Sequence, residues 1–176
     1  MNIRDRRDVS QFKEAAEKFC TLLETVPDDA DAWVEKIVAA LAHLYAYGHD
    51  LPDLELPDDA PDVPDSFDVS DKEWKEVETL VSKVLGEQVG YWSYFDPSEP
   101  PDTADEPVFG ILSDDLADIY RDVKPGLRAW ATVDDIYLPS IIFDWKFPLF
   151  GSHWGVHAVS ALRALHPLAY LRGIQG

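Results

Sequence analysis

The chain has 176 residues, which is enough for one domain, and 46% of them are hydrophobic, which is enough for a substantial core. Thirty-four acidic residues against 15 basic ones give a net charge of −19. This charge argues against direct binding to nucleic-acid phosphates and to anionic membranes, because both depend on lysine and arginine. A protein partner with a basic surface, or a cation, is the natural counterpart of such a chain.

Cys20 is the single cysteine of the sequence, so no disulfide can form within the chain. It falls on the apolar face of a predicted helix, which indicates a small core residue and not a nucleophile. The first twelve residues, MNIRDRRDVSQF, lack the apolar run of a signal peptide. No stretch approaches the ~20 apolar residues of a membrane span. We therefore expect a cytoplasmic protein.

The first part of the chain predicts two helices joined by a short turn. Apolar residues recur at helical spacing after Ser10, the expected N-cap, until Pro27 ends the run. A second helix is predicted from about Asp31 to Gly48, a favourable C-terminal residue. The short connection favours an antiparallel pair. Residues 1–9 and 168–176 are expected to be loosely ordered.

Two acidic, proline-rich segments interrupt the helical pattern. Residues 50–67 contain four prolines and seven acidic residues, as is typical of a solvated loop. A second irregular region is predicted over residues 87–110, where an acidic run from Pro97 to Pro107 follows a group of aromatic residues. We expect this group to fold over one end of a bundle, although a pocket mouth or a partner site is also open. Its members are Tyr91, Trp92, Tyr94 and Phe95.

The segment between these loops predicts a well-defined helix. Ser70 and Glu73 have the spacing of a capping box, in which each side chain binds the other residue's backbone amide. Apolar residues follow at helical spacing until Gly86, where we expect the helix to end.

The sequence SDDLADIYRD predicts a helix with one acidic face. Ser113 is the expected N-cap. At 100° per residue, four aspartates share an arc opposite the apolar face, with Arg121 at its edge. Pro125 and Gly126 are expected to kink or end this helix, with one extra turn after them. The four aspartates are Asp114, Asp115, Asp118 and Asp122.

The last third of the chain predicts two further helices. The first should start near Pro139, a favourable first helical residue, although Ile141 and Ile142 make a strand the competing prediction. The second is predicted to be capped by Ser152 and to be disturbed at Pro167.

Two histidines on this last helix suggest a metal site. His153 and His157 are four residues apart, which places both imidazoles on one helix face, and Asp115 and Asp118 could complete an open site that activates water. The alternative, which stays open, is a structural network of these residues with the backbone and with arginines. No serine-hydrolase elbow, phosphate-binding loop or dinucleotide fingerprint is present. The whole candidate cluster comprises Asp114, Asp115, Asp118, Asp122, Arg121, His153, Trp154 and His157.

Three phrases of the sequence are similar to a known family. They are LAHLYAYGHDLP, DDLADIYRDVKPGL and, after a Trp/Phe-rich run, HWGVHAVSALRALH. Together they resemble the domain-of-unknown-function 5063 family of bacterial proteins over nearly the whole chain. The resemblance implies a single all-helical domain and no established biochemical role.

These observations predict an all-α, single-domain bundle of five or six helices, spanning residues 1–176, with two acidic Pro-rich loops. The leading functional hypothesis is a binding or adaptor module, not an enzyme, that presents an acidic surface to a protein partner. The alternative is a metal-dependent, hydrolase-like enzyme with a His/Asp site between two helices, and a third is an acidic nucleic-acid mimic. No cofactor is expected unless the second hypothesis holds, in which case a divalent metal is.

Overall fold

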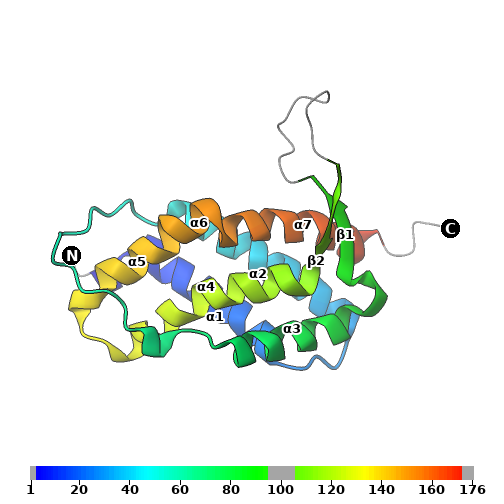
Figure 1. Ribbon diagram of the computed structural model, residues 1–176, viewed down its shortest axis with the longest axis horizontal. Coiled ribbons are helices and arrows are strands. Elements are labelled where there is room, and N and C mark those ends of the chain that lie inside the picture. Colours follow the sequence, from blue (N-terminus) through cyan, green and yellow to red (C-terminus); the bar gives the residue numbers. More distant parts are fainter. Residues whose placement is uncertain (1–2, 95–105, 172–176) are drawn as a thin grey trace.

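The computed structural model describes residues 3–94 and 106–171, and this part of the chain forms a helical bundle (Figure 1). The prediction of an all-α single domain is confirmed. The helices are α1 (Arg7–Glu24), α2 (Ala30–Asp50), α3 (Asp71–Leu85), α4 (Leu112–Thr132), α5 (Leu138–Lys146), α6 (Pro148–Ser152) and α7 (Trp154–Tyr170).

Helix α4 is the central element of the bundle. It packs against α1, α3, α5 and α7, while α2 packs against α1 and α7 (Figure 1). The apolar stripes of these helices meet in one core, because burying each stripe removes apolar surface from water. Cys20 is 1% exposed within this core, as predicted. Among the helices described, none combines the length and the apolar character that crossing a membrane requires.

A β-hairpin corrects the prediction of an irregular region at residues 87–110. Strands β1 (Gly90–Ser93) and β2 (Val108–Ile111) pair antiparallel, with Trp92 opposite Phe109. Aromatic side chains on both strands and β-branched side chains on β2 favour a strand pair, and the cross-strand aromatic contact stabilises it. Phe95 and most of the second acidic run lie outside the described residues.

Several predicted helix ends are confirmed and others are wrong. Ser70 and Glu73 form the capping box, and Gly86 follows α3 with a φ of +56°. Helix α1 begins at Arg7 and not after Ser10, and neither Ser113 nor Ser152 caps a helix. Tertiary contacts explain one of these errors. The Ser113 hydroxyl is buried and donates to Glu78 Oε1 on α3 at 3.0 Å, so it is not free to cap its own helix.

Neither Gly48 nor Pro125 ends its helix, because packing overrides local preference. Helix α2 continues through Gly48, where the Trp154 indole occupies the space of a Cβ, and α4 continues through Pro125. Next to that proline, Gly126 leaves room for the Trp145 indole, whose Nε1 donates to the Val123 carbonyl at 3.1 Å. The free energy of these contacts offsets the loss of the helical hydrogen bond that Pro125, which has no N–H, cannot make. Helix α7 likewise runs through Pro167 to Tyr170.

Candidate metal centre

The candidate site lies between one face of α4 and the first turn of α7. On α4, Asp115, Asp118 and Asp122 are spaced i, i+3 and i+7, so the helical period places them in one row. His153 precedes the first residue of α7 and His157 follows one turn later, and their rings lie 4.8 Å apart. Packing of α4 on α7 brings the row of carboxylates to the imidazoles.

Each imidazole is held by its own carboxylate. His153 Nδ1 lies 2.6 Å from Asp122 Oδ2, and His157 Nδ1 lies 2.7 Å from Asp115 Oδ1. The hydrogen bond to Asp115 raises the pKa of His157, although partial burial opposes this effect. Burial raises the pKa of Asp122, and the hydrogen bond with His153 partly offsets that rise. A ring that donates Nδ1–H to a carboxylate presents Nε2 to other ligands.

Asp118 is positioned between the two histidines and α3. The indole of Trp74 on α3 donates Nε1–H to Asp118 Oδ1 at 2.8 Å. The other oxygen, Oδ2, lies 3.7 Å from His157 Nε2. One ligand atom from each of Asp118, His153 and His157 can be chosen so that all three lie within 4.8 Å of one another.

The β-hairpin contributes a further contact to the site. Tyr91 on β1 donates its hydroxyl to Asp115 Oδ2 at 2.6 Å, so both oxygens of this carboxylate are engaged. Desolvation and the neighbouring Asp115 charge raise the pKa of Tyr91, which therefore remains a hydrogen-bond donor. The Tyr91 ring lies against Gly110 of β2, where a Cβ would overlap it. Both strands thus fix the tyrosine that orients Asp115.

This arrangement has the parts of a two-histidine, one-carboxylate metal site. Asp118, His153 and His157 are the candidate ligands, while Asp122 and Asp115 hydrogen-bond the Nδ1 atoms of the two histidines, as carboxylates behind metal-binding histidines usually do. Tetrahedral zinc bonds of about 2.0–2.2 Å place ligand atoms roughly 3.4 Å apart. The three atoms, which lie within 4.8 Å of one another, would therefore have to approach by up to about 1.4 Å. The His153 side chain is 44% exposed and that of His157 is 25% exposed, so solvent and small molecules can reach the site.

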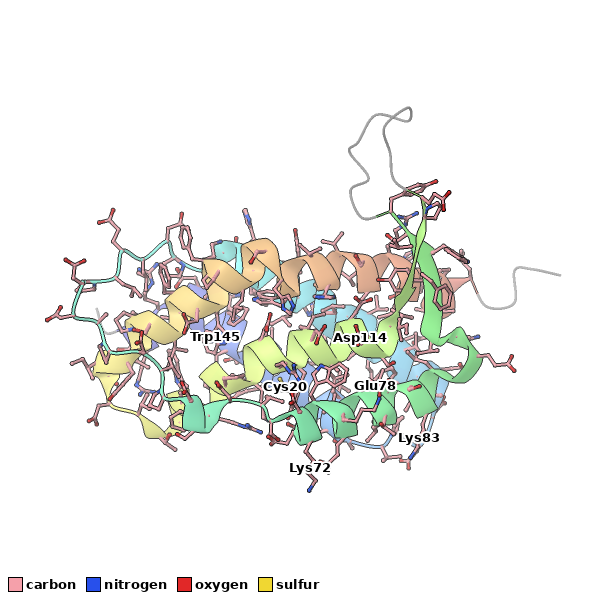
Figure 2. All side chains as sticks on the ribbon, viewed as in Figure 1. Cys20, Lys72, Glu78, Lys83, Asp114 and Trp145 are labelled. Atoms are coloured by element: carbon pink, nitrogen blue, oxygen red, sulfur yellow. The ribbon has the colours of Figure 1, made fainter. Side chains whose placement is uncertain are left out.

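The remaining predicted residues lie outside this group. Asp114 is on the exposed side of α4 (Figure 2), and loss of hydration and repulsion from Asp118 and Asp115 raise its pKa. Arg121 pairs with Asp71 at 3.0 Å and not with an aspartate of the cluster. Trp154 is fully buried in the core and donates to the Trp145 carbonyl at 2.9 Å, so it supports the bundle and not the site.

Sequence reasoning missed two contributors to the site. Trp74 fits the apolar period of the helix that follows Ser70, and Tyr91 is one member of the aromatic group before the second acidic run. Both are half-buried, and a half-buried Trp N–H or Tyr O–H needs a hydrogen-bond acceptor. That requirement was the available signal, but the acceptors are 44 and 24 residues away along the chain.

The comparisons with known proteins agree with this fold. No curated protein matches the chain. A similar solved structure is the crystal structure of protein BF1032 from Bacteroides fragilis, with a TM-score of 0.74 and 24% identity over 97% of this chain and 96% of that one. At that identity the likeness supports the fold alone. The model of the domain of unknown function 5063 (DUF5063) matches residues 5–171, which confirms the resemblance seen in the sequence. The chain therefore belongs to the DUF5063 family.

Proposed function

We propose that the protein binds a divalent transition metal through Asp118, His153 and His157 and uses it to activate water for hydrolysis. The observation that carries the proposal is the pair of carboxylate–imidazole contacts, at 2.6 and 2.7 Å, around a third carboxylate. In metal sites the same partners set the tautomer and raise the basicity of the ligand nitrogen.

The chain's own residues have separable roles in this proposal. Asp122 and Asp115 orient the two rings, while Trp74 holds one oxygen of Asp118 so that the other faces the histidines. Three protein ligands leave at least one position open on a four-coordinate metal, and a bound water there becomes acidic enough to supply hydroxide near neutral pH. The imidazoles and carboxylates are the mixed ligand set that zinc, iron and manganese accept.

Elemental analysis of protein purified without a His tag tests the proposal. We expect near-stoichiometric zinc, iron or manganese in the wild type, and its loss in the double variant His153→Ala/His157→Ala. The matched control is His43→Ala/His49→Ala, which removes two histidines of α2 that lie outside the site. A wild type that stays metal-free after incubation with each ion would refute the proposal. The cluster would then be a structural network, and the first double variant would only lower stability.

A protein-binding module is the second candidate, and the net charge of −19 favours it. The described acidic loop that follows α2 would present carboxylates to a basic partner. A nucleic-acid mimic is a special case, in which the partner's basic groove normally binds phosphates. In pulldowns, a specific partner should be lost at high salt and with Asp58→Asn/Asp59→Asn/Asp62→Asn, while metal content stays unchanged. A partner that is still captured at high salt and by the triple variant would count against this candidate.

A further inference from the structure

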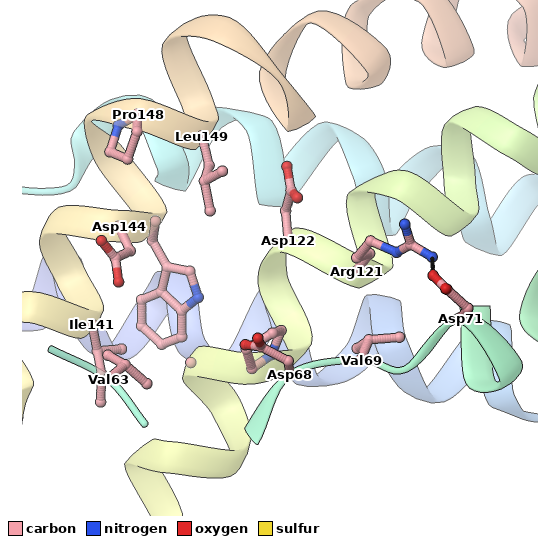
Figure 3. A pocket seen from close by; sticks show the side chains of 13 residues that line it. Val63, Asp68, Val69, Asp71, Arg121, Asp122, Ile141, Asp144, Pro148 and Leu149 are labelled. Carbon is pink, nitrogen blue, oxygen red and sulfur yellow. Dashed lines mark hydrogen bonds and ion pairs between the residues drawn. The ribbon is translucent and has the colours of Figure 1, made fainter. Parts of the chain in front are cut away.

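A cavity of about 420 Å³ lies next to the candidate metal centre, between α4, α5 and the loop before α3 (Figure 3). Asp122 lines this cavity and also holds His153. On the same wall, the backbone carbonyl of Leu149 accepts a hydrogen bond from the backbone N–H of His153 at 2.9 Å. The cavity and the metal centre therefore share a wall, and a molecule in the cavity would lie beside the candidate ligands. The volume is within the usual range for small-molecule sites.

The walls of the cavity are built by fixed elements of the fold. The buried side chains of Trp145 and Ile141 on α5 provide an apolar surface, and Val63 covers it from the loop. Ser140 fastens that loop to α5, because its hydroxyl donates to the Pro61 carbonyl at 2.8 Å. Such a surface accommodates the hydrocarbon part of a ligand.

The charged groups of the cavity favour a positive ligand. Asp144 on α5 and Asp122 on α4 line it from two different helices, and Asp68 lines it from the loop (Figure 3). The carboxylates of Asp144 and Asp68 form no hydrogen bond or ion pair with the described residues. Asp144 is partly buried, whereas Asp68 is exposed. A carboxylate that is partly removed from water usually has a cationic or hydrogen-bonding partner, and Asp144 lacks one among the described residues.

The one basic residue of the lining does not reverse this preference. Arg121 is turned toward Asp71, with which it pairs at 3.0 Å (Figure 3). Its guanidinium also lies over the Trp74 ring. An anionic ligand would therefore have to displace an existing ion pair in the presence of three further carboxylates. The net charge of −19 adds a field that concentrates cations and repels anions.

We propose that this cavity binds an organic cation, an amine with an apolar body, whose ammonium group pairs with Asp144 in the negative field of Asp68 and Asp122 while its hydrocarbon packs on Trp145 and Ile141. The geometry makes this site distinct from the metal ligands, with Asp122 between the two. The further step, that the bound amine is part of the hydrolytic substrate, rests on the proposed function.

Calorimetric titration at 150 mM NaCl tests the binding with three probes of similar shape. They are phenethylamine, neutral 2-phenylethanol and anionic 3-phenylpropionate. We expect phenethylamine to bind at least tenfold more tightly than the other two. Asp144→Asn, which keeps the shape and removes the charge, should weaken the amine at least tenfold. The matched control Asp58→Asn removes an exposed charge outside the cavity and should leave the affinity unchanged.

Each outcome decides the inference. If the amine binds no better than the alcohol or the acid, or if Asp144→Asn and Asp58→Asn behave alike, the inference is wrong. Asp68→Asn provides a second variant if Asp144→Asn does not fold. Amine binding that persists in His153→Ala/His157→Ala, together with a metal-free wild type, would refute the proposed function and leave the cavity assignment intact. Metal binding without amine binding would refute the cavity assignment and leave the proposed function intact.

Discussion

Replacing Trp154 by alanine should remove one of the main supports of the bundle. Its side chain is fully buried, and its ring packs against Phe150 and Phe12 with centroid distances of 4.8 and 5.9 Å. Its Nε1–H also supplies the Trp145 carbonyl with a hydrogen bond at 2.9 Å. The variant therefore loses buried apolar area, two aromatic contacts and one buried hydrogen bond.

The magnitude follows from these losses. Emptying a buried aromatic site costs about 3–5 kcal/mol, which already includes most of the aromatic contacts. Leaving the carbonyl without its donor adds about 1 kcal/mol, so we expect the free energy of unfolding to fall by about 4–6 kcal/mol. For a domain of this size, each kcal/mol lowers the melting temperature by roughly 2–4 °C.

Denaturant unfolding followed by circular dichroism measures this loss. Trp92→Ala is the matched control, because that indole is 67% exposed and its removal should cost less than ~1 kcal/mol. A loss below ~1 kcal/mol for Trp154→Ala would refute the reasoning, since it would place that indole at the surface.

A second variant tests the specific contact with α2. Gly48→Ala should destabilise the wild type by about 1–3 kcal/mol, because the new methyl group overlaps the Trp154 ring. In the Trp154→Ala background the same change should be neutral or stabilising, since alanine is the better helix former by about 1 kcal/mol. Equal effects in the two backgrounds would show that the two residues do not touch.

Three further predictions concern titratable groups. Burial raises the pKa of the Cys20 thiol to about 12, so an aromatic disulfide reagent should modify it only after unfolding, and rapid labelling of the native protein would contradict this. Asp115→Asn should weaken metal affinity about 10–100-fold, measured by competition with a chelator, because it removes the carboxylate that holds His157. An unchanged affinity would show that this carboxylate does not support a metal ligand. In the metal-free protein the pKa of His157 is raised above its ordinary value of 6.5. The ion pair between His157 and Asp115 therefore stabilises the fold fully below pH 6.5. This contribution is lost as the pH rises through the pKa that His157 has in the folded protein. Denaturant melts between pH 5 and 9 should show this loss in the wild type and a smaller loss in Asp115→Asn, where only the charges of Asp118 and Asp114 still raise the pKa of His157.

Local patterns in the sequence determined the helices and much of the candidate site. The 3.6-residue period was sufficient to place Asp115, Asp118 and Asp122 on one face of α4, and the i, i+4 spacing placed His153 beside His157. These features depend on residues within two helical turns of one another. Capping at Ser70 and the end of α3 at Gly86 were predictable for the same reason.

Only the tertiary structure decided which of these faces meet and where local signals fail. Gly48 and Pro125 read as helix ends, but indoles from distant helices pack against α2 and α4 there, and a strand partner turns the segment around Tyr91 into a hairpin. The roles of the aspartates were likewise set by long-range packing, which places Asp115 behind His157 and leaves Asp118 toward both rings. The spacing of residues in the sequence determines which side of a helix each side chain faces. Which residue that side chain contacts depends on how several helices pack together. That packing is a sum of many small contacts between residues far apart in the chain.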